Sequence, residues 1–125
     1  MTDSHYRKFD RSVTVRWEQV GFHCWPEANG VREYLSTRHR HKFFFTLTVD
    51  VFHNDREIEF HDLLDFAKTI IVEQELGRQS CEDLATTIID AVVAKYPQTA
   101  SSRTIRCSVF EDNEVGATLT REANK

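Results

Sequence analysis

An alternation of apolar and polar positions from residue 39 to 51 is the longest regular pattern in the chain. Successive side chains of a β-strand point to opposite faces, so this alternation predicts a strand with one buried face. His39 and His41 share the buried parity, and their imidazoles should therefore turn inward at the end of the sheet. Phe44 is the apolar exception on the other face. The buried positions are Phe43, Phe45, Leu47, Val49 and Val51.

The two histidines of this strand are candidates for metal binding. Imidazoles at i and i+2 on one strand face lie close enough together to share a metal ion. Because an H-x-H pair is a weak motif by itself, partly exposed histidines at the start of a strand are the alternative. The spacing alone leaves both interpretations open.

Shorter patterns predict three more strands and two helices. Residues 13–18, 105–109 and 115–120 alternate as half-buried strands do. Apolar residues at helical spacing predict one helix over about 62–77 and a second over 80–97, where a capping box precedes the apolar stripe. The expected fold class is α+β, with a four-stranded antiparallel sheet in ββααββ order and both helices on one face.

Length and composition indicate one globular domain spanning residues 1–125, with polar, flexible ends at 1–11 and 121–125. The chain is 40% hydrophobic and 29% charged, which is typical of a folded protein rather than a disordered one. Its formal net charge is -4, with basic and acidic residues mixed along the chain. This charge gives no support for nucleic-acid binding.

Cysteine usage and apolar run lengths bear on the compartment. The chain has 3 cysteines at wide, unpaired spacings, which argues against a disulfide framework and for a reducing compartment. No apolar run approaches the ~20 residues of a membrane span, and the first residues lack the apolar core of a signal peptide. We therefore expect a cytoplasmic protein that does not associate with membranes.

Five short motifs follow one another along the chain, and each has a counterpart in one known family. They are Phe22-His23, His39-Arg40-His41, the segment 58–63 (I-E-F-H-D-L), the segment 79–85 (Q-S-C-E-D-L-A) and Val109-Phe110-Glu111. Together they resemble the family of 6-pyruvoyl-tetrahydropterin synthase and 6-carboxy-tetrahydropterin synthase, which has the tunnelling fold. The corresponding family motifs are a first metal histidine, H-G-H, V-x-D-F-x-x-L, P-T-A-E-N-L-A and a terminal V-x-E.

The resemblance implies a zinc site made by His23, His39 and His41. Three imidazoles with one open position are typical of catalytic zinc, which can lower the pKa of substrate hydroxyls as a Lewis acid. The resemblance also implies that Glu111 binds the ligand by accepting two hydrogen bonds from the base of a pterin. Sites in this family lie between the subunits of a homohexamer, so we expect a homo-oligomer here, most simply a hexamer.

The chain departs from the family where protons are transferred. The family's catalytic Cys precedes H-G-H, but residues 35–38 contain none. Cys24, beside His23, is one candidate substitute, although neighbouring strand residues face opposite ways unless a bulge intervenes. His61 is the other candidate, because the Asp-His pair between the family's helices is absent from residues 71–77.

Two functions follow from this combination. The first is a zinc-dependent carbon–oxygen lyase that acts on dihydroneopterin triphosphate, in queuosine (7-deazaguanine) or pterin synthesis. The alternative is a non-catalytic member that binds a pterin- or purine-like ligand, or an oligomeric interaction protein. The metal and ligand residues favour the first function, and the missing proton-transfer residues favour the second.

Overall fold

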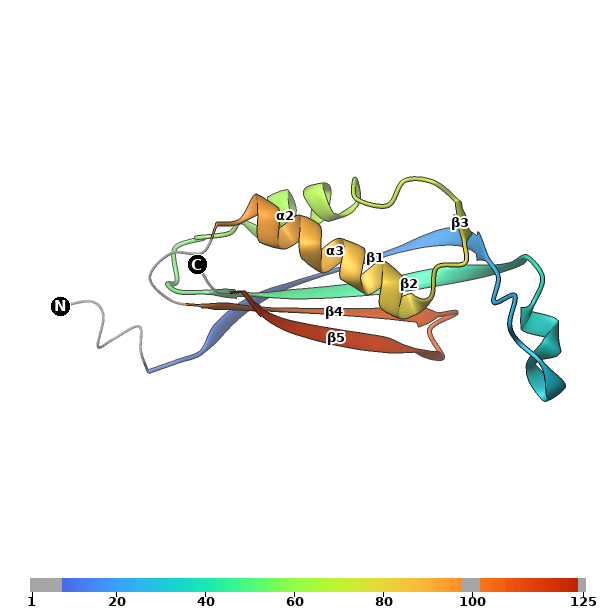
Figure 1. The fold of residues 1–125 in the computed structure, drawn as a ribbon. Helices are drawn as coiled ribbons and strands as arrows, with labels where there is room; N and C mark the ends of the chain where they lie inside the picture. Colours follow the sequence, from blue (N-terminus) through green and yellow to red (C-terminus); the bar gives the residue numbers. More distant parts are fainter. Residues whose placement is uncertain (1–7, 98–101, 124–125) are drawn as a thin grey trace.

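The computed structural model describes residues 8–97 and 102–123, which form a sheet covered by helices on one face (Figure 1). Strands predominate, as the alternating sequence patterns predict. The elements in chain order are β1 (Arg11–His23), the 3-10 helix η1 (Gly30–Leu35), β2 (His39–Val51), α2 (Phe60–Ala67), β3 (Glu75–Gly77), α3 (Cys81–Lys95), β4 (Arg103–Glu111) and β5 (Val115–Ala123).

The predicted four-stranded antiparallel ββααββ sheet is wrong. The sheet is curled and mixed, with five strands in the order β3-β1-β2-β4-β5, and β3 runs parallel to β1. The extra strand forms because the chain returns from α2 along the open edge of β1. There the amide of Phe22 donates to the Gln74 carbonyl at 2.8 Å, and the amide of Cys24 donates to the Gly77 carbonyl at 2.9 Å. Three residues without a sequence period are enough for this pairing.

The long central strands pair along their whole length. The antiparallel register of β1 and β2 runs from Arg11↔Val51 to His23↔His39 without interruption. The alternation predicted for β2 is confirmed, since its odd positions from Phe43 onward are buried. The core between this face and the helices includes Phe43, Phe45, Leu47, Val49, Leu63, Leu84, Ile88, Val92, Ile105, Cys107 and Val109.

Helix α2 is half the length that the apolar spacing predicts. It ends at Ala67, and residues 68–74 continue as turn and loop. Four successive residues, 69–72, are β-branched, and such side chains lose rotamer freedom in a helix. Ile71 still packs into the core from the loop, and its carbonyl accepts a 2.8 Å hydrogen bond from the Gln19 side chain. The apolar spacing thus reflects burial of these residues rather than continuation of the helix.

Helix α3 begins where its sequence predicts. The Ser80 side chain accepts from the Asp83 amide and the Asp83 carboxylate accepts from the Ser80 amide, each at 3.1 Å. This capping box satisfies two of the free amides at the helix start. The buried side of the helix packs on β4 and β5, so its first turn lies over the end of β4.

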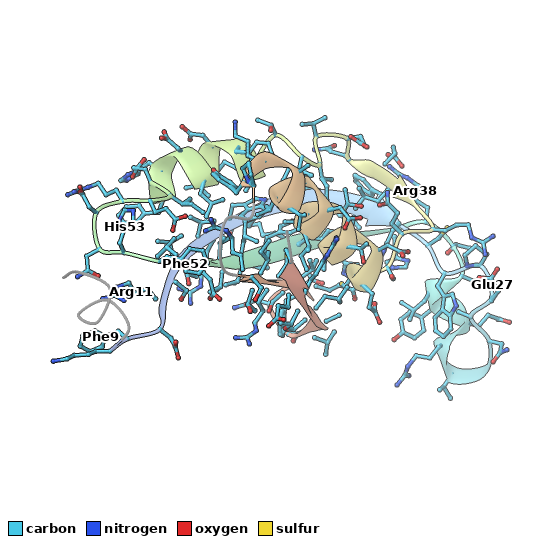
Figure 2. All side chains as sticks on the ribbon, turned by 60° about the vertical axis from the view of Figure 1, so that its left-hand side comes forward. Phe9, Arg11, Glu27, Arg38, Phe52 and His53 are labelled. Atoms are coloured by element: carbon cyan, nitrogen blue, oxygen red, sulfur yellow. The ribbon has the colours of Figure 1, made fainter. Side chains whose placement is uncertain are left out.

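The chain ends and the two ends of the sheet differ in their surroundings. The segments 1–11 and 121–125 were expected to be flexible. The structure places Arg11 in β1 and residues 121–123 in β5. Residues 1–7 and 124–125 lie outside the described residues. Figure 2 shows Glu27 and Arg38 at the η1 end of the molecule, and Phe52 and His53 at the opposite end. None of the helices in the described ranges is long and apolar enough to cross a membrane.

Candidate metal centre

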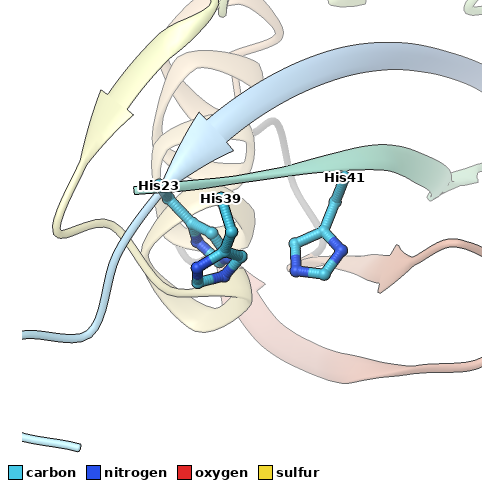
Figure 3. Close-up of side chains that lie close together, drawn as sticks. All are labelled: His23, His39 and His41. Atoms are coloured by element: carbon cyan, nitrogen blue, oxygen red, sulfur yellow. The ribbon is translucent and has the colours of Figure 1, made fainter. Parts of the chain in front are cut away.

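The end of β1 and the start of β2 bring three histidines to one face of the sheet (Figure 3). The strand register pairs His23 directly with His39 and places His41 opposite Gly21. The ring centroids lie 4.6 Å apart for His23 and His39, 5.2 Å for His23 and His41, and 4.9 Å for His39 and His41. One ligand nitrogen of each ring lies within 4.8 Å of the other two, so this group could hold a metal ion.

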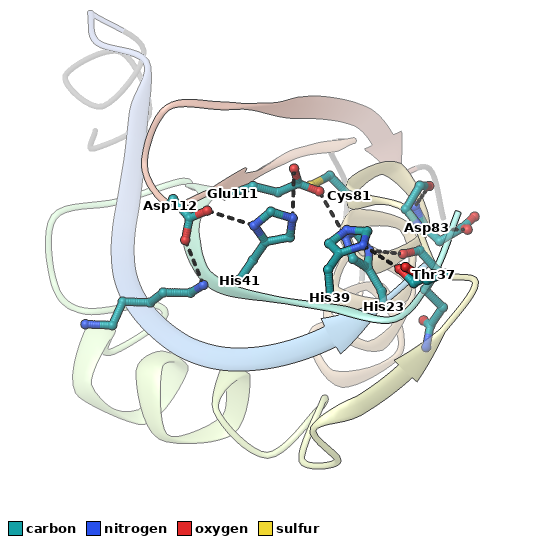
Figure 4. Close-up of polar contacts among 11 residues, drawn as sticks. His23, Thr37, His39, His41, Cys81, Asp83, Glu111 and Asp112 are labelled. Carbon is teal, nitrogen blue, oxygen red and sulfur yellow. Dashed lines mark hydrogen bonds and ion pairs between the residues drawn. The ribbon is translucent and has the colours of Figure 1, made fainter. Parts of the chain in front are cut away.

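Each of the three rings is oriented by an oxygen atom at its Nδ1 (Figure 4). Carbonyl and carboxylate oxygens accept hydrogen bonds, so Nδ1 carries a proton in each ring and Nε2 is the atom through which the ring can bind a metal. A second interaction of this kind orients most metal-bound histidines in proteins. The bonds are His23 to the Gln79 carbonyl at 2.8 Å, His39 to the Thr37 carbonyl at 2.8 Å and His41 to the Asp112 carboxylate at 2.7 Å.

The spacing of the ligand nitrogens fits a metal ion after a small contraction. Zinc–nitrogen bonds of about 2.0–2.1 Å place the ligands of a tetrahedral site roughly 3.3 Å apart. The three ligand nitrogens now lie within 4.8 Å of one another. The distances between them must therefore shorten by up to about 1.5 Å when a metal binds. Phe43, which is fully buried, lies edge-on to His23 at 5.2 Å and to His41 at 5.7 Å. The histidines therefore pack against an apolar side chain, and two of them, His23 and His39, also line a cavity.

Asp112 holds His41 from the turn between β4 and β5. Its carboxylate accepts from the Lys42 amide at 3.0 Å, and its own amide donates to the Lys42 carbonyl at 2.8 Å. The Lys42 amide, followed by the His41 side chain, lowers the pKa of the Asp112 carboxyl below its usual value. Asp112 has a φ of 54°, a conformation that Asp tolerates better than most residues. The hairpin turn and the orientation of His41 thus depend on the same residue.

Glu111 points inward, as its parity predicts, and its carboxylate lies against the histidines. Its Oε2 is 3.2 Å from Nε2 of His23, and its Oε1 is 3.5 Å from Nε2 of His41. The hydrogen bond with His23 lowers the pKa of Glu111 against the opposing effect of burial. The same bond raises the pKa of His23. The carboxylate was expected to find its partners on a ligand, but it already has partners within the chain.

A cavity of about 460 Å³ opens beside the histidines, between the start of α3 and the β4–β5 hairpin. Cys24 follows the last residue of β1 and lines this cavity. Trp25 forms part of the wall and is 51% exposed. The other lining residues are His23, Leu35, His39, Arg78, Gln79, Ser80, Cys81, Glu82, Glu111, Val115, Gly116 and Ala117.

The two candidate proton-transfer residues have different locations. Cys24 lies at the cavity, because the strand ends before it and the rule of opposite faces no longer applies. His61 lies in the first turn of α2, where it is exposed and bonded to the Glu59 carboxylate at 2.9 Å. It is not among the residues around the cavity. A third group, the thiol of Cys81, lies 3.8 Å from Oε2 of Glu111, and burial raises its pKa to about 12.

The oxygen atoms that hold the rings were not found from the sequence. Asp112 was not identified, although its position directly after Glu111 was a usable signal. The contributions of Gln79 and Thr37 come from backbone carbonyls, which any residue could provide. Comparison of the chain with models of known protein families and with curated proteins gives no match. The resemblance to the tetrahydropterin synthases therefore stays a prediction from the motifs.

Proposed function

We propose that this protein binds zinc through His23, His39 and His41 and acts on a small pterin-like ligand, as the tetrahydropterin synthases do. The observation that carries the proposal is the orientation of all three rings by oxygen atoms at Nδ1. A chance cluster of histidines has no need of three such bonds, whereas a metal site requires a defined tautomer at each ring.

The ligand set favours zinc among the common metals. Imidazole nitrogen suits zinc, copper, iron and nickel, but zinc imposes no geometry through its d electrons and is the usual metal of three-histidine sites. When bound, zinc supplies a Lewis acid that polarises ligand oxygens. The residues of the chain then orient the ligand beside it and exclude water from the buried side, where Phe43 lies.

The cavity supports a flat, bicyclic ligand. Its volume of about 460 Å³ lies in the range of small-molecule sites. Glu111 offers two carboxylate oxygens that can accept from neighbouring N–H groups on one edge of a pterin or purine. Trp25, half exposed at the wall, offers an aromatic surface for the face of such a ring.

A non-catalytic ligand-binding protein is the second candidate, and the thiols favour it. The pKa of about 12 keeps Cys81 protonated at neutral pH, so it is a poor general base. His61 lies away from the cavity. Cys24 is then the remaining thiol beside the histidines, and catalysis of the family's kind would depend on it.

Incubation with dihydroneopterin triphosphate separates the two candidates. The enzyme is expected to release triphosphate in a zinc-dependent manner, and Cys24→Ser and His39→Ala should each abolish the release. Binding of neopterin by calorimetry without any triphosphate release would support the ligand-binding protein. If protein shown to contain zinc neither releases triphosphate nor binds neopterin, both candidates are contradicted.

We propose further that the protein is a homo-oligomer, most simply a hexamer. Among residues 8–97 and 102–123, strand β5 is paired only with β4, so its other side is an open edge of this sheet. Open edges readily pair with other chains. Light scattering at micromolar concentration should give a mass that is a multiple of 14.6 kDa, and a monomer would contradict this proposal.

A further inference from the structure

We propose that Glu111 is a fourth protein ligand of the metal, so that the ligand-free centre is a closed site of three imidazoles and one carboxylate. This proposal rests on the proposed function, because it assumes the metal at His23, His39 and His41. It differs from the role of Glu111 as a residue that only binds a small molecule.

Distances at the carboxylate support direct coordination. Oε2 lies 3.2 Å from Nε2 of His23, and Oε1 lies 3.5 Å from Nε2 of His41. Neighbouring ligands of a tetrahedral zinc ion, with bonds of about 2.0–2.2 Å, lie roughly 3.3 Å apart. Glu111 therefore already has the spacing from two imidazoles that a shared metal requires, and a metal ion would take the place of the proton in its hydrogen bond with His23.

The state of His41 gives independent support. Its Nδ1 is bonded to Asp112, whereas its Nε2 is buried and has no hydrogen-bond partner in the described part of the chain. A buried nitrogen without a partner is costly, and a metal ion at this point would satisfy it. The carboxylate beside it, 3.5 Å away, contributes the negative charge that favours a divalent cation there.

The backbone position of Glu111 restricts where its carboxylate can lie. The β2–β4 register places Glu111 opposite Phe43, two residues from His41 on the same strand face. The carboxylate oxygen that contacts His23, Oε2, also lies 3.8 Å from the buried thiol of Cys81 at the start of α3. The side chain is 23% exposed and directed between the helix and the histidines, so its oxygen atoms have few other positions.

A closed site has a consequence for ligand entry. Zinc sites with four protein ligands are usually structural, and catalytic sites keep an open position. A pterin-like ligand in the cavity would have to replace Glu111 on the metal, which frees the same carboxylate for the N–H groups of the base. Glu111 would then alternate between the metal and the ligand.

Zinc affinity of the full chain, measured by chelator competition, tests the proposal. Removing residues that only orient metal ligands typically lowers affinity 10–100-fold, so loss of a direct ligand should cost at least tenfold. Glu111→Gln is expected to lower zinc affinity by at least about tenfold and to shift the visible absorption bands of the cobalt-substituted protein. Glu114→Gln removes the same charge from an exposed position in the same hairpin and should leave both unchanged.

The outcomes separate this proposal from the proposed function. If His39→Ala loses zinc while Glu111→Gln matches Glu114→Gln, coordination by Glu111 is overturned and the three-histidine site stands. If His39→Ala binds zinc as the unaltered chain does, the proposed function itself fails. Thermal melting of the metal-free variants checks their folding. If Glu111→Gln does not fold, Glu111→Asp is used in its place. The Asp side chain is shorter by one methylene, so its carboxylate should no longer reach the metal and zinc affinity should fall similarly.

Discussion

Replacing Glu57 by Gln should destabilise the protein strongly, because it separates a nearly buried ion pair far from the metal centre. The guanidinium of Arg103 has a side-chain exposure of 3%, and its Nη2 donates to the Glu57 carboxylate at 2.7 Å. Its Nη1 donates to the Asp50 carbonyl at 2.6 Å, and Phe52 lies under its plane at 4.9 Å. The Phe52 amide also donates to Glu57, at 2.8 Å.

The magnitude follows from the charge that the substitution leaves behind. Removing one partner of a buried ion pair costs on the order of 3–5 kcal/mol, because the other charge stays buried without compensation. Glu57 is 21% exposed, so we expect about 3 kcal/mol, at the lower end of that range. For a chain of 125 residues, a loss of that size corresponds to a fall in Tm of roughly 12 °C.

The effect should also depend on pH. Burial raises the pKa of Glu57, but the bonds from Arg103 and the Phe52 amide outweigh it, and the net pKa is lowered. A carboxyl group whose pKa is lower in the folded state stabilises the fold above its unfolded pKa of about 4.3. This contribution is lost as the pH falls through the folded pKa. The stability difference between the unaltered chain and Glu57→Gln should therefore be largest at neutral pH and vanish in acid.

Urea denaturation between pH 3 and 7 measures this difference. Asp55→Asn is the matched control, since Asp55 pairs with Arg56 at 3.3 Å in full solvent and should have almost no effect. Substituting both Glu57 and Arg103, by Gln and Met, should recover part of the loss, because no buried charge remains. A Glu57→Gln midpoint equal to that of Asp55→Asn at pH 7 would refute the reasoning.

Three more predictions concern the metal centre and the hairpin beside it. Protein purified without chelator should contain about one zinc per chain by elemental analysis, and His39→Ala with His41→Ala should remove it; unchanged zinc would contradict the site. Asp112→Asn should lower zinc affinity roughly tenfold in chelator competition, because the carboxylate that orients His41 is lost; affinity within twofold would argue against this role. Gly116→Ala should cost about 1–3 kcal/mol in urea denaturation, since the new Cβ would lie 2.6 Å from Cα of Phe110; an unchanged midpoint would show that the strands can separate there.

The sequence predicted the long elements because their patterns arise from burial on one face. The alternation in β2 and the capping box of α3 are local signals, and both were confirmed. Strand β3 was missed because Glu75–Gly77 has no period of its own and forms only on the edge that β1 leaves open. Gly77 was expected to end a helix, and its φ of +62° instead serves the turn out of this short strand.

The clustering of the three histidines was predictable from the sequence, but the contacts that support them were not. Strand parity and the H-x-H spacing identified His39 and His41, and a motif resemblance added His23. The structure places one ligand nitrogen of each within reach of a common ion. The position of Glu111 against the imidazoles could not be read from parity, which gives the face of a strand but not the distance between side chains on different strands.

Two of the three contacts that orient the rings join parts of the chain that are far apart in sequence. His23 and Gln79 are separated by 56 residues, and His41 and Asp112 by 71. Closing such long loops is slow and occurs late when a chain folds. A partly folded molecule without the β4–β5 hairpin would therefore hold its histidines loosely and bind metal weakly. Tight metal binding during refolding would report that the two ends of the chain have joined the same sheet.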